Sequence, residues 1–488
     1  MPSAVDVGIA ACGAYVPRLR LSRAEVASAQ AWVNPGLRPL ARAERSVCGW
    51  DEDAITMAVE AARATLADRD RATIGRAYLG STTAPYADRL NGGVVSGALG
   101  LREDAAAFDV GGSMRAGTSA LLAAFDAAAA REDDVLCVAA DRRRAAAATQ
   151  QELVIGHAAA ALVVGRGPGI ARLLGHASLT VDFVDHFRAA DREFDYQWEE
   201  RWVRDEGYLK LVPRLVGDLL AQTGVAARDI ARFCLPSPIR RVDQQVARAI
   251  GIAAERVSDP LSDGCGDSGA AHPLLMLVHA LESARAGDKI LVVGFGQGGD
   301  AILLEATGAP TGGAAAGVTR WLDRRASCSY PRYLALDGLV KLDRGIRAEA
   351  DKGSALTAAY RHRDFLLSLT GGRCDACGTH QIPRGDICVD PDCHAVGALA
   401  PHSFAESAGR VATWSADRLT FTPDPPAYYG TVDFAEGGRL LMDFADVDEG
   451  AVDVGTPMRM VFRIKDRDPV RGFARYFWKA APVAAEEA

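Results

Sequence analysis

The first 306 residues alternate short strand-like runs with longer helical patterns, and this alternation constrains the fold more than any other feature of the sequence. The apolar runs at 135–141 and 289–295 have the length and branched-residue content of buried strands. The segments at 118–133 and 272–287 have the length and apolar content of helices. Strands that alternate with helices build parallel βαβ units, so we predict a layered α/β domain.

A weak internal repeat runs through this α/β region. The turn GGSMRAG at 111–117 leads into a small-residue helix and then into a strand. The turn GCGDSG at 264–269 leads into a helix and a strand in the same order. Each half of the region therefore holds the same glycine turn, helix and buried strand. The two related halves are expected at 1–170 and 171–306.

The sequence changes character after residue 306. A stretch rich in Gly, Ala and Pro indicates a linker. Helical patterns follow, then paired cysteines, and then short alternating segments with Gly, Pro and Asp turns that are typical of a small antiparallel barrel. The predicted parts are a linker at 307–318, a helical adaptor at 319–370, a zinc ribbon at 371–400 and an OB-like β-barrel at 401–488.

Four of the ten cysteines fall in one short window, while the other six are scattered. The four are Cys374, Cys377, Cys388 and Cys393. Two turn-borne pairs of thiolates suit a tetrahedral Zn²⁺ shell, in which His380 or His394 can replace a sulfur. This distribution favours a metal site in a reducing compartment over a disulfide framework; an iron site and coincidental free cysteines are the competing interpretations. Four ligands leave no open position, so we expect structural zinc and no redox cofactor.

The charge balance argues against nucleic acid and membranes as partners. The formal net charge is -8, and the apolar stretches are far shorter than the ~20 residues that a bilayer requires. The N-terminus lacks the pattern of a signal peptide, which favours a cytoplasmic protein. Zinc ribbons and OB folds also serve single-stranded nucleic acid, but the acidic residues of the barrel region would repel phosphate.

Five motifs in order carry a family resemblance. They are FDVGGSMRAGT from Phe108, VAADRR from Val138, GHAAAALVVG from Gly156, GCGDSGAA from Gly264 and GFGQGG from Gly294. Through them the first 306 residues resemble the thiolase superfamily, closest to ketoacyl synthase III and hydroxymethylglutaryl-CoA synthase. The rest resembles the zinc-ribbon and OB-fold module found beside acyl-CoA thiolases, through the cysteine window, Pro425-Pro426 and the run from Gly437. The resemblance implies a five-layer α/β/α/β/α core, a homodimer, and substrates that are acyl-CoA or acyl-carrier-protein thioesters.

The same resemblance shows that the usual catalytic residues are replaced. Met114 stands where the family has its nucleophilic cysteine, and a thioether cannot form an acyl-enzyme. The histidine segment reads LPSPI at 235–239, and the asparagine position is Asp267. The glutamate base of hydroxymethylglutaryl-CoA synthases falls near Thr82. These four replacements argue against Claisen chemistry through a cysteine acyl-enzyme.

Three functions remain compatible with this pattern. Ser113, beside the nucleophile position, and Asp267 can act with His157 or His272 in acyl transfer, although all of these residues also fit structural roles. The protein can instead bind a thioester and polarise its carbonyl without covalent catalysis. It can also be a catalytically silent partner that supports an active thiolase or synthase. A carrier protein is a further possible partner. We favour an enzyme of acyl transfer or carbon–carbon bond chemistry.

The segment from Val181 to Lys210 mixes aromatic and charged residues. A solvated helix with an aromatic packing face is the simpler interpretation. The alternative is a cap over the acyl site, as the corresponding insertion forms in related synthases. In that case His186, with Asp185 beside it, is the nearest acid–base candidate. The catalytic candidates are thus Ser113, Asp267 and His186.

Overall fold

The computed structural model describes residues 6–309, 317–343, 353 and 355–483. The chain forms two compact units, which are described separately below. Unit 1 comprises Met1–Gly49, Asp53–Val95 and Leu101–Leu339; unit 2 comprises Trp50–Glu52, Ser96–Gly100 and Val340–Ala488. The boundary between the two units therefore falls inside the segment predicted to be a helical adaptor. Parts of the predicted linker (310–316) and adaptor (344–352 and 354) lie outside the described residues.

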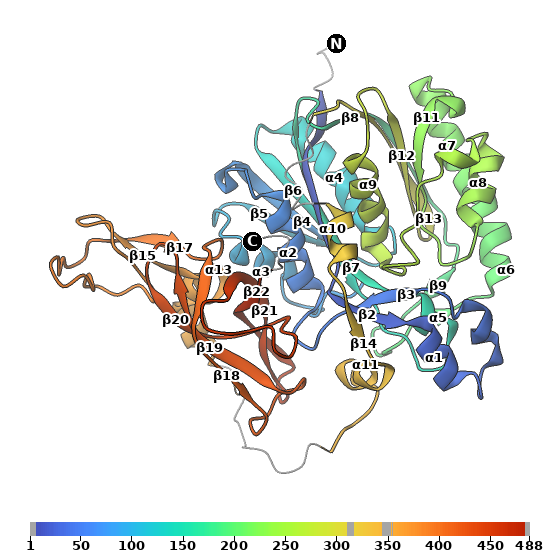
Figure 1. Ribbon diagram of the computed structural model, residues 1–488. Helices are drawn as coiled ribbons and strands as arrows, with labels where there is room; N and C mark the ends of the chain where they lie inside the picture. Colours follow the sequence, from blue (N-terminus) through green and yellow to red (C-terminus); the bar gives the residue numbers. More distant parts are fainter. Residues whose placement is uncertain (1–5, 310–316, 344–352, 354, 484–488) are drawn as a thin grey trace. The chain divides into compact units, whose positions relative to one another are not determined.

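A nine-stranded sheet forms the centre of unit 1, with strand order β11-β12-β13-β8-β1-β7-β6-β4-β5 (Figure 1). Its strands are β1 (Val7–Tyr15), β4 (Ile74–Gly80), β5 (Ala106–Val110), β6 (Asp134–Arg142), β7 (His157–Arg166), β8 (Ala171–Thr180), β11 (Ile230–Cys234), β12 (Lys289–Phe295) and β13 (Gly298–Ala306). Parallel pairing is confined to β4 with β5 and β6, and to β11 with β12. The remaining pairs are antiparallel, so the expectation of parallel units holds only at the two ends of the sheet.

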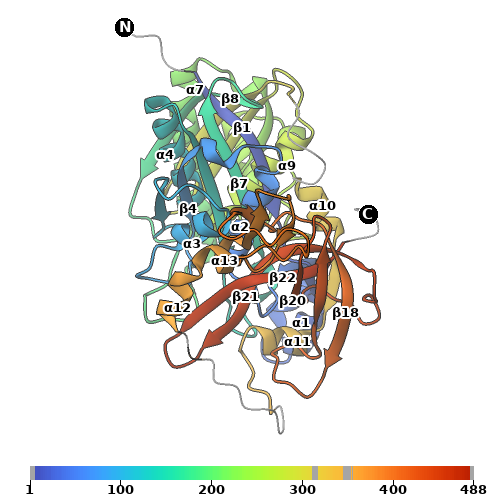
Figure 2. The same ribbon diagram turned by 90° about the vertical axis from the view of Figure 1, so that its left-hand side faces the viewer.

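Helices α4 (Ala116–Ala130) and α9 (His272–Glu282), labelled in Figure 2, are the two helices of the internal repeat. Both contact β7 and β12. Helix α2 (Ala54–Thr65) packs on β1, β6 and β7, whereas α7 (Leu209–Thr223) packs on β8 and β13. A Cβ atom at Gly117 would lie only 2.2 Å from the carbonyl oxygen of Ala270. Glycine is therefore required where the start of α4 meets the turn before α9.

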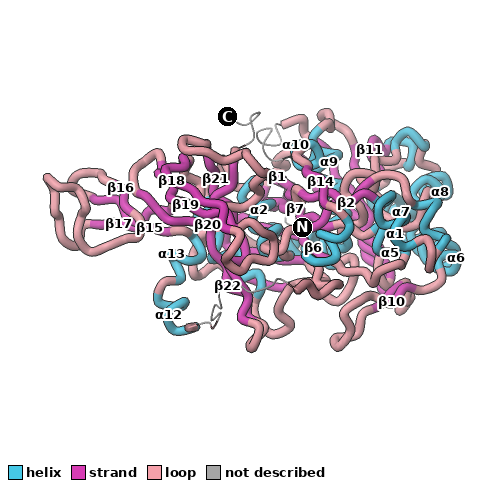
Figure 3. The backbone as a smooth tube through the Cα atoms, turned by 60° about the horizontal axis from the view of Figure 1, so that its bottom comes forward, coloured by secondary structure: helices cyan, strands magenta, loops and turns pink. Residues whose placement is uncertain are grey.

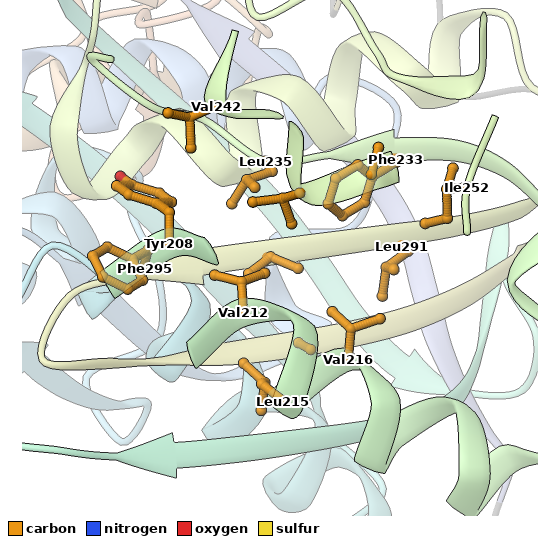
Figure 4. Close-up of a cluster of buried hydrophobic side chains, with 14 of the residues drawn as sticks. Tyr208, Val212, Leu215, Val216, Phe233, Leu235, Val242, Ile252, Leu291 and Phe295 are labelled. Carbon is orange, nitrogen blue, oxygen red and sulfur yellow. The ribbon is translucent and has the colours of Figure 1, made fainter. Parts of the chain in front are cut away.

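The apolar stripe of α7 holds this helix on the sheet. Val212, Leu215 and Val216 lie on one helical face and are buried against β12 and β13 (Figure 4). Each such side chain contributes about 1.5–3 kcal/mol when it leaves water. At one end of the cluster, Tyr208 stacks on Phe295 with ring centroids 4.1 Å apart. These two rings also line the cavity described below.

A small sheet explains why residues up to Leu339 belong to unit 1. Strand β14 (Ala326–Cys328) pairs with β2 (Leu19–Ser22), which in turn pairs with β3 (Glu44–Val47).

The other described helices of unit 1 contain few residues. They are α1 (Arg23–Gln30), η1 (Pro35–Leu40), η2 (Arg71–Thr73), α5 (Gln150–Val154), α6 (Glu200–Trp202), η3 (Val203–Tyr208), η4 (Ala227–Asp229), α8 (Val242–Ile250), η5 (Ala254–Arg256), η6 (Gly269–Ala271), α10 (Val318–Asp323) and α11 (Tyr330–Leu336); α3 (Asn91–Ala98) spans residues of both units.

Unit 2 consists mainly of β-strands (Figure 3), and the strands of its two sheets pair antiparallel. A five-stranded sheet has the order β20-β19-β18-β21-β22, and a bridge between Phe444 and Ala480 connects its two outer strands. A three-stranded sheet, β16-β15-β17, carries the cysteine window. The strands are β15 (Thr370–Cys374), β16 (His380–Gln381), β17 (Leu399–Ser403), β18 (Gly409–Asp417), β19 (Ala427–Phe434), β20 (Arg439–Asp443), β21 (Pro457–Asp468) and β22 (Phe473–Pro482), with helices α12 (Leu356–Arg361) and α13 (Arg363–Ser368) before them.

Candidate active site and metal centre

One cavity in unit 1 brings together three residues that the sequence indicated as site positions. Met114, His186 and Asp267 all line it. The other lining residues are Arg143, Gln151, Val154, Ile155, Asp185, Gln197, Glu200, Val203, Tyr208, Pro236, Pro238, Ile239, Gly269, Pro273 and Phe295. Its volume of about 70 Å³ is enough for several water molecules or a short acyl group.

Met114 lies in the turn immediately before α4. Its sulfur is 4.0 Å from the hydroxyl of Thr82, so the structure places these two residues side by side. Below this turn, the buried carboxylate of Asp300 accepts hydrogen bonds from Thr118 and Ser119 of α4 and from the guanidinium of Arg115. These hydrogen bonds hold the turn in place. The side chain at position 114 is nevertheless a thioether and not an acidic thiol.

Ser113 is not among the described residues that line the cavity. Its hydroxyl donates a hydrogen bond to the carbonyl oxygen of Gly296 at 3.0 Å. A Cβ atom at Gly296 would lie 2.7 Å from the same hydroxyl, so the two segments are closely packed. The hydroxyl therefore ties the turn before α4 to the loop after β12.

Asp267 is paired with Arg143, which lies in the VAADRR run but is not among the catalytic candidates. Arg143 lies 3.3 Å from Asp267 and 2.6 Å from Asp195. Burial opposes the charge of the Arg143 guanidinium, but the two carboxylates outweigh burial and raise its pKa. Asp195 also lies 3.7 Å from Arg188. Asp267 is thus a carboxylate within an ion-pair network.

Asp141 is a second residue that sequence reasoning missed. Its fully buried carboxylate accepts hydrogen bonds from Ser81, from the hydroxyls and backbone amides of Thr82 and Thr83, and from the amide of Ala270. Asp141 thus joins the loop after β4 to the turn before α9. Its position within the VAADRR run, near the end of β6, was the available signal, because polar residues at strand ends often order neighbouring loops.

The segment from Val181 to Lys210 is a cap on the cavity, and the predicted solvated helix is wrong for its first half. Strands β9 (His186–Phe187) and β10 (Tyr196–Gln197) form a hairpin, and the helix begins only at Glu200. The rings of Phe187 and Tyr196 pair across the hairpin at 5.3 Å. Such cross-strand aromatic pairs stabilise a hairpin over a helix.

The cap carries an imidazole–carboxylate pair into the cavity wall. The Nδ1 atom of His186 is 2.6 Å from the carboxylate of Asp185. The side-chain amide of Gln297 donates to the other oxygen of Asp185 at 3.0 Å. The contact with Asp185 occupies Nδ1, so Nε2 is the ring nitrogen that remains for a ligand. The pair has the geometry required for general acid–base catalysis.

Further along, η3 is a π-helix that places Tyr208 in the cavity wall. Burial raises the pKa of Tyr208, so its phenol stays protonated. Pro236, Pro238 and Ile239 of the LPSPI segment also line the cavity. This part of the wall is therefore apolar.

His157 and His272 have both ring nitrogens engaged. His157 accepts from the amide of Cys48 and contacts the carbonyl oxygen of Arg143, each at 2.9 Å. His272 accepts from the amide of Ser268 at 2.9 Å and contacts the carbonyl oxygen of Pro260 at 2.7 Å. Both rings serve as structural connectors between loops.

The four clustered cysteines of unit 2 converge on one point. Their sulfur atoms all lie within 4.8 Å of one another. Cys374 and Cys393 are 3.8 Å apart at sulfur, and Cys377 and Cys388 are 3.5 Å apart. A tetrahedral zinc site with Zn–S bonds of about 2.3 Å requires sulfurs about 3.8 Å apart. The donor set therefore fits a metal ion such as zinc, and His380 and His394 are not needed as ligands.

Comparison with known proteins places this geometry in a family. Residues 220–306 match the family described as 3-oxoacyl-[acyl-carrier-protein] synthase III C terminal, and residues 404–463 match the ChsH2 C-terminal OB-fold domain. The chain is 31% identical over 299 residues to a hydroxymethylglutaryl-CoA synthase of Methanopyrus kandleri, covering 60% of this chain and 85% of that protein. The chain belongs to the hydroxymethylglutaryl-CoA synthase family. The resemblance drawn from the sequence motifs is thereby confirmed.

Solved structures agree on the fold of the hydroxymethylglutaryl-CoA synthase family. A synthase crystallised with CoA has a TM-score of 0.61 at 19% identity, covering 72% of this chain and 94% of that one. A synthase of the curacin biosynthetic pathway, in complex with an acetyl donor carrier protein, has a TM-score of 0.59 at 20% identity and covers 68% and 88%. Unit 1 therefore has a thiolase-like α/β fold, and the OB-fold domain follows it in the same chain.

None of the helices in the described part of the chain has both the length and the apolar character needed to cross a membrane.

Proposed function

We propose that the protein binds an acyl-CoA or acyl-carrier-protein thioester in the cavity and moves a proton at the carbon next to the thioester carbonyl. The His186–Asp185 pair, which lines the same cavity as Met114, carries this proposal. The proposal accounts for a protein that has the fold of acyl-CoA condensing enzymes but carries Met114 where the family resemblance expects the nucleophilic cysteine. The reaction class is carbon–carbon bond chemistry or acyl transfer without a covalent acyl-enzyme.

In the proposed step, Nε2 of His186 removes a proton from the α-carbon of the bound thioester. The electron pair of the broken C–H bond moves into the carbonyl group, which becomes an enolate. Asp185 stabilises the imidazolium that forms, because its carboxylate is 2.6 Å from Nδ1. The enolate is then able to attack a second carbonyl compound or to recover a proton from His186.

The geometry gives less support to a serine acyl-enzyme. The Ser113 hydroxyl donates to Gly296, and both His157 and His272 already use their ring nitrogens. A serine nucleophile requires a base within hydrogen-bond reach. We therefore place Ser113 outside the reacting groups and treat Asp267 as the residue that fixes Arg143 in the cavity wall.

The relatives suggest the ligands and the assembly. One was crystallised with CoA and another with an acetyl donor carrier protein, so we propose CoA or carrier-protein thioesters for this chain. We further propose a homodimer of five-layer thiolase-like cores, built from the halves 1–170 and 171–306. The linker, adaptor, ribbon and barrel would follow at 307–318, 319–370, 371–400 and 401–488, with structural zinc in the ribbon. None of the ten cysteines, all of which lie within the described residues, forms a disulfide, and this favours a reducing, cytoplasmic setting.

A silent-partner role is the second candidate. Met114 favours it, since a thioether at the nucleophile position is what a non-catalytic homologue would retain. In this role unit 1 would support an active thiolase or synthase without turning over a thioester itself.

Exchange of acetyl-CoA protons with deuterated water separates the two candidates. The wild-type protein should catalyse incorporation of deuterium into the acetyl methyl group, detected by mass spectrometry of the recovered thioester. His186→Asn should slow the exchange by about 10²–10⁴-fold, as expected for loss of a general base. His176→Asn, in β8 and outside the cavity wall, is the matched control and should exchange normally. Equal exchange by wild type and His186→Asn would refute the proposed base; no exchange, with tight binding of a thiolase, would favour the silent partner.

A further inference from the structure

A second group of metal-ligating side chains lies in unit 2, apart from the four cysteines. One donor atom each from His380, His402 and Glu436 lies within 4.8 Å of the others. The Nε2 atom of His402 is 2.9 Å from Oε2 of Glu436. The two imidazole rings are 4.4 Å apart at their centroids. Two imidazoles and one carboxylate form a donor set that binds divalent transition metals.

The sheet of the ribbon brings the two histidines to one face. His380 in β16 is opposite Arg373 of β15, and His402 in β17 is opposite Gly371 of the same strand. Opposite residues of antiparallel strands share a face, as do residues two apart in one strand. Both histidines therefore project from the same face of the three-stranded sheet.

A tight turn of the barrel supplies the carboxylate. Glu436 lies between β19 and β20, and the two residues after it, Gly437 and Gly438, both have positive φ angles. A Cβ atom at Gly437 would lie 3.4 Å from the carbonyl oxygen of His380. The glycines thus allow this turn to approach the ribbon closely.

Hydrogen bonds orient the carboxylate of Glu436 and favour its charged form. The Ser407 hydroxyl donates to Oε2 of Glu436 at 2.9 Å, and such outer hydrogen bonds commonly orient metal ligands. The hydrogen bond from His402 lowers the pKa of Glu436 despite its partial burial. The described residues provide no hydrogen bond to either ring nitrogen of His380. The His380 ring packs edge-on against the rings of His402 and Phe404, which holds it close enough to share a metal ion with His402 and Glu436.

We propose that His380, His402 and Glu436 bind a divalent first-row transition ion, zinc under ordinary conditions, with at least one coordination position left to water or an exogenous ligand. Three protein ligands are typical of zinc sites that keep an open position. Glu436 is about two-fifths exposed, so solvent reaches the site. The ion would join the ribbon strands to the barrel turn, and its site is distinct from the four-thiolate site.

Metal stoichiometry of the full-length protein tests this assignment. After equilibrium dialysis against micromolar Zn²⁺, the wild type should hold two zinc ions per chain. His380→Ala and Glu436→Gln should each hold one, as should Cys377→Ser, which removes a ligand of the other site. Glu449→Gln, at a highly exposed carboxylate of the same unit, is the matched control and should hold two.

Cobalt substitution identifies which site each variant loses. Thiolate-to-cobalt charge-transfer absorption should persist in His380→Ala and disappear in Cys377→Ser. If His380→Ala also lost this absorption, its ribbon would be unfolded, so the signal serves as the folding control. Wild type that binds a single ion, or a His380→Ala protein that still binds two, would overturn the proposal and leave the three side chains as a hydrogen-bonded cluster.

Discussion

The guanidinium of Arg143 lies 3.3 Å from the carboxylate of Asp267, at the position where the family resemblance expects an asparagine. The same guanidinium lies 2.6 Å from Asp195 of the cap, so one cation connects the cap to the turn before α9. This relationship makes Asp267 a fixed anion and gives the cap a buried anchor. We therefore expect unit 1 to respond to loss of this central cation.

Replacing Arg143 with methionine should therefore destabilise unit 1. The change leaves Asp195, whose side chain is only 6% exposed, without its main partner. Removing one member of a buried pair costs about 3–5 kcal/mol, because the remaining charge stays desolvated. Urea unfolding should show this loss of free energy. Asp104→Asn, at an exposed surface pair with Arg102, is the control and should change stability by less than about 1 kcal/mol.

Met114→Cys should restore covalent chemistry. The thiol would lie in the turn immediately before α4, where the helix N-terminus favours a thiolate. Incubation with acetyl-CoA should add one acetyl group to this variant, detected by intact-protein mass spectrometry, while wild type stays unmodified. Failure of the variant to be acylated, although it binds acetyl-CoA normally, would show that Met114 is not at the nucleophile position.

His157 should make the stability of unit 1 depend on pH. Burial, reinforced by Arg142 and Arg45, lowers the pKa of His157 well below its usual range. The folded protein then keeps the ring neutral while the unfolded chain takes up a proton below pH ~6.5. Stability should therefore be full above that pH and fall on acidification, by up to about 1.4 kcal/mol per pH unit.

The variant His157→Gln tests the origin of this pH dependence. It should be less stable at neutral pH, but its unfolding free energy should fall less steeply than that of wild type as the pH drops below ~6.5. His362→Asn, at an exposed ring, should keep the wild-type slope. Identical slopes in wild type and His157→Gln would assign the pH dependence to other groups.

Metal removal should unfold the ribbon of unit 2. A four-thiolate zinc site contributes about 10–16 kcal/mol of apparent binding free energy, which is available only to the folded site. A chelator strong enough to extract the ion should increase hydrogen exchange at the amides of β15 and β17, and zinc should reverse the change. Unchanged exchange in the fully metal-free protein would contradict a structural role.

Local patterns in the sequence predict the metal centre and the repeat well. The cysteine window lies within about twenty residues, and ligand spacing alone indicates its geometry. The glycine turn before each buried helix is equally local, and Gly117 is required by the close approach of Ala270. The family is indicated by five motifs that follow one another in a fixed order, which is also a property of the linear chain.

The missed residues depend on long-range pairing. Arg143 meets Asp195 and Asp267 from positions 52 and 124 residues away, and no local pattern connects them. The sequence favours a helix for the cap because aromatic and charged residues alternate irregularly there. The hairpin becomes evident only from the pairing of Phe187 with Tyr196 in the folded chain. The cysteine spacing suggests His380 only as a substitute ligand, since its neighbours His402 and Glu436 are brought close by the folding of unit 2.

The rate of deuterium incorporation by Asp185→Asn is the most direct test of the central claim, that an imidazole–carboxylate pair and no acyl-enzyme performs the chemistry. Asparagine retains the size of Asp185 and a carbonyl oxygen for Gln297 but removes the charge that supports His186. The account predicts an exchange rate lowered about a hundredfold or more, with acetyl-CoA affinity by calorimetry unchanged. A variant that binds acetyl-CoA and exchanges its protons at the wild-type rate would contradict the account.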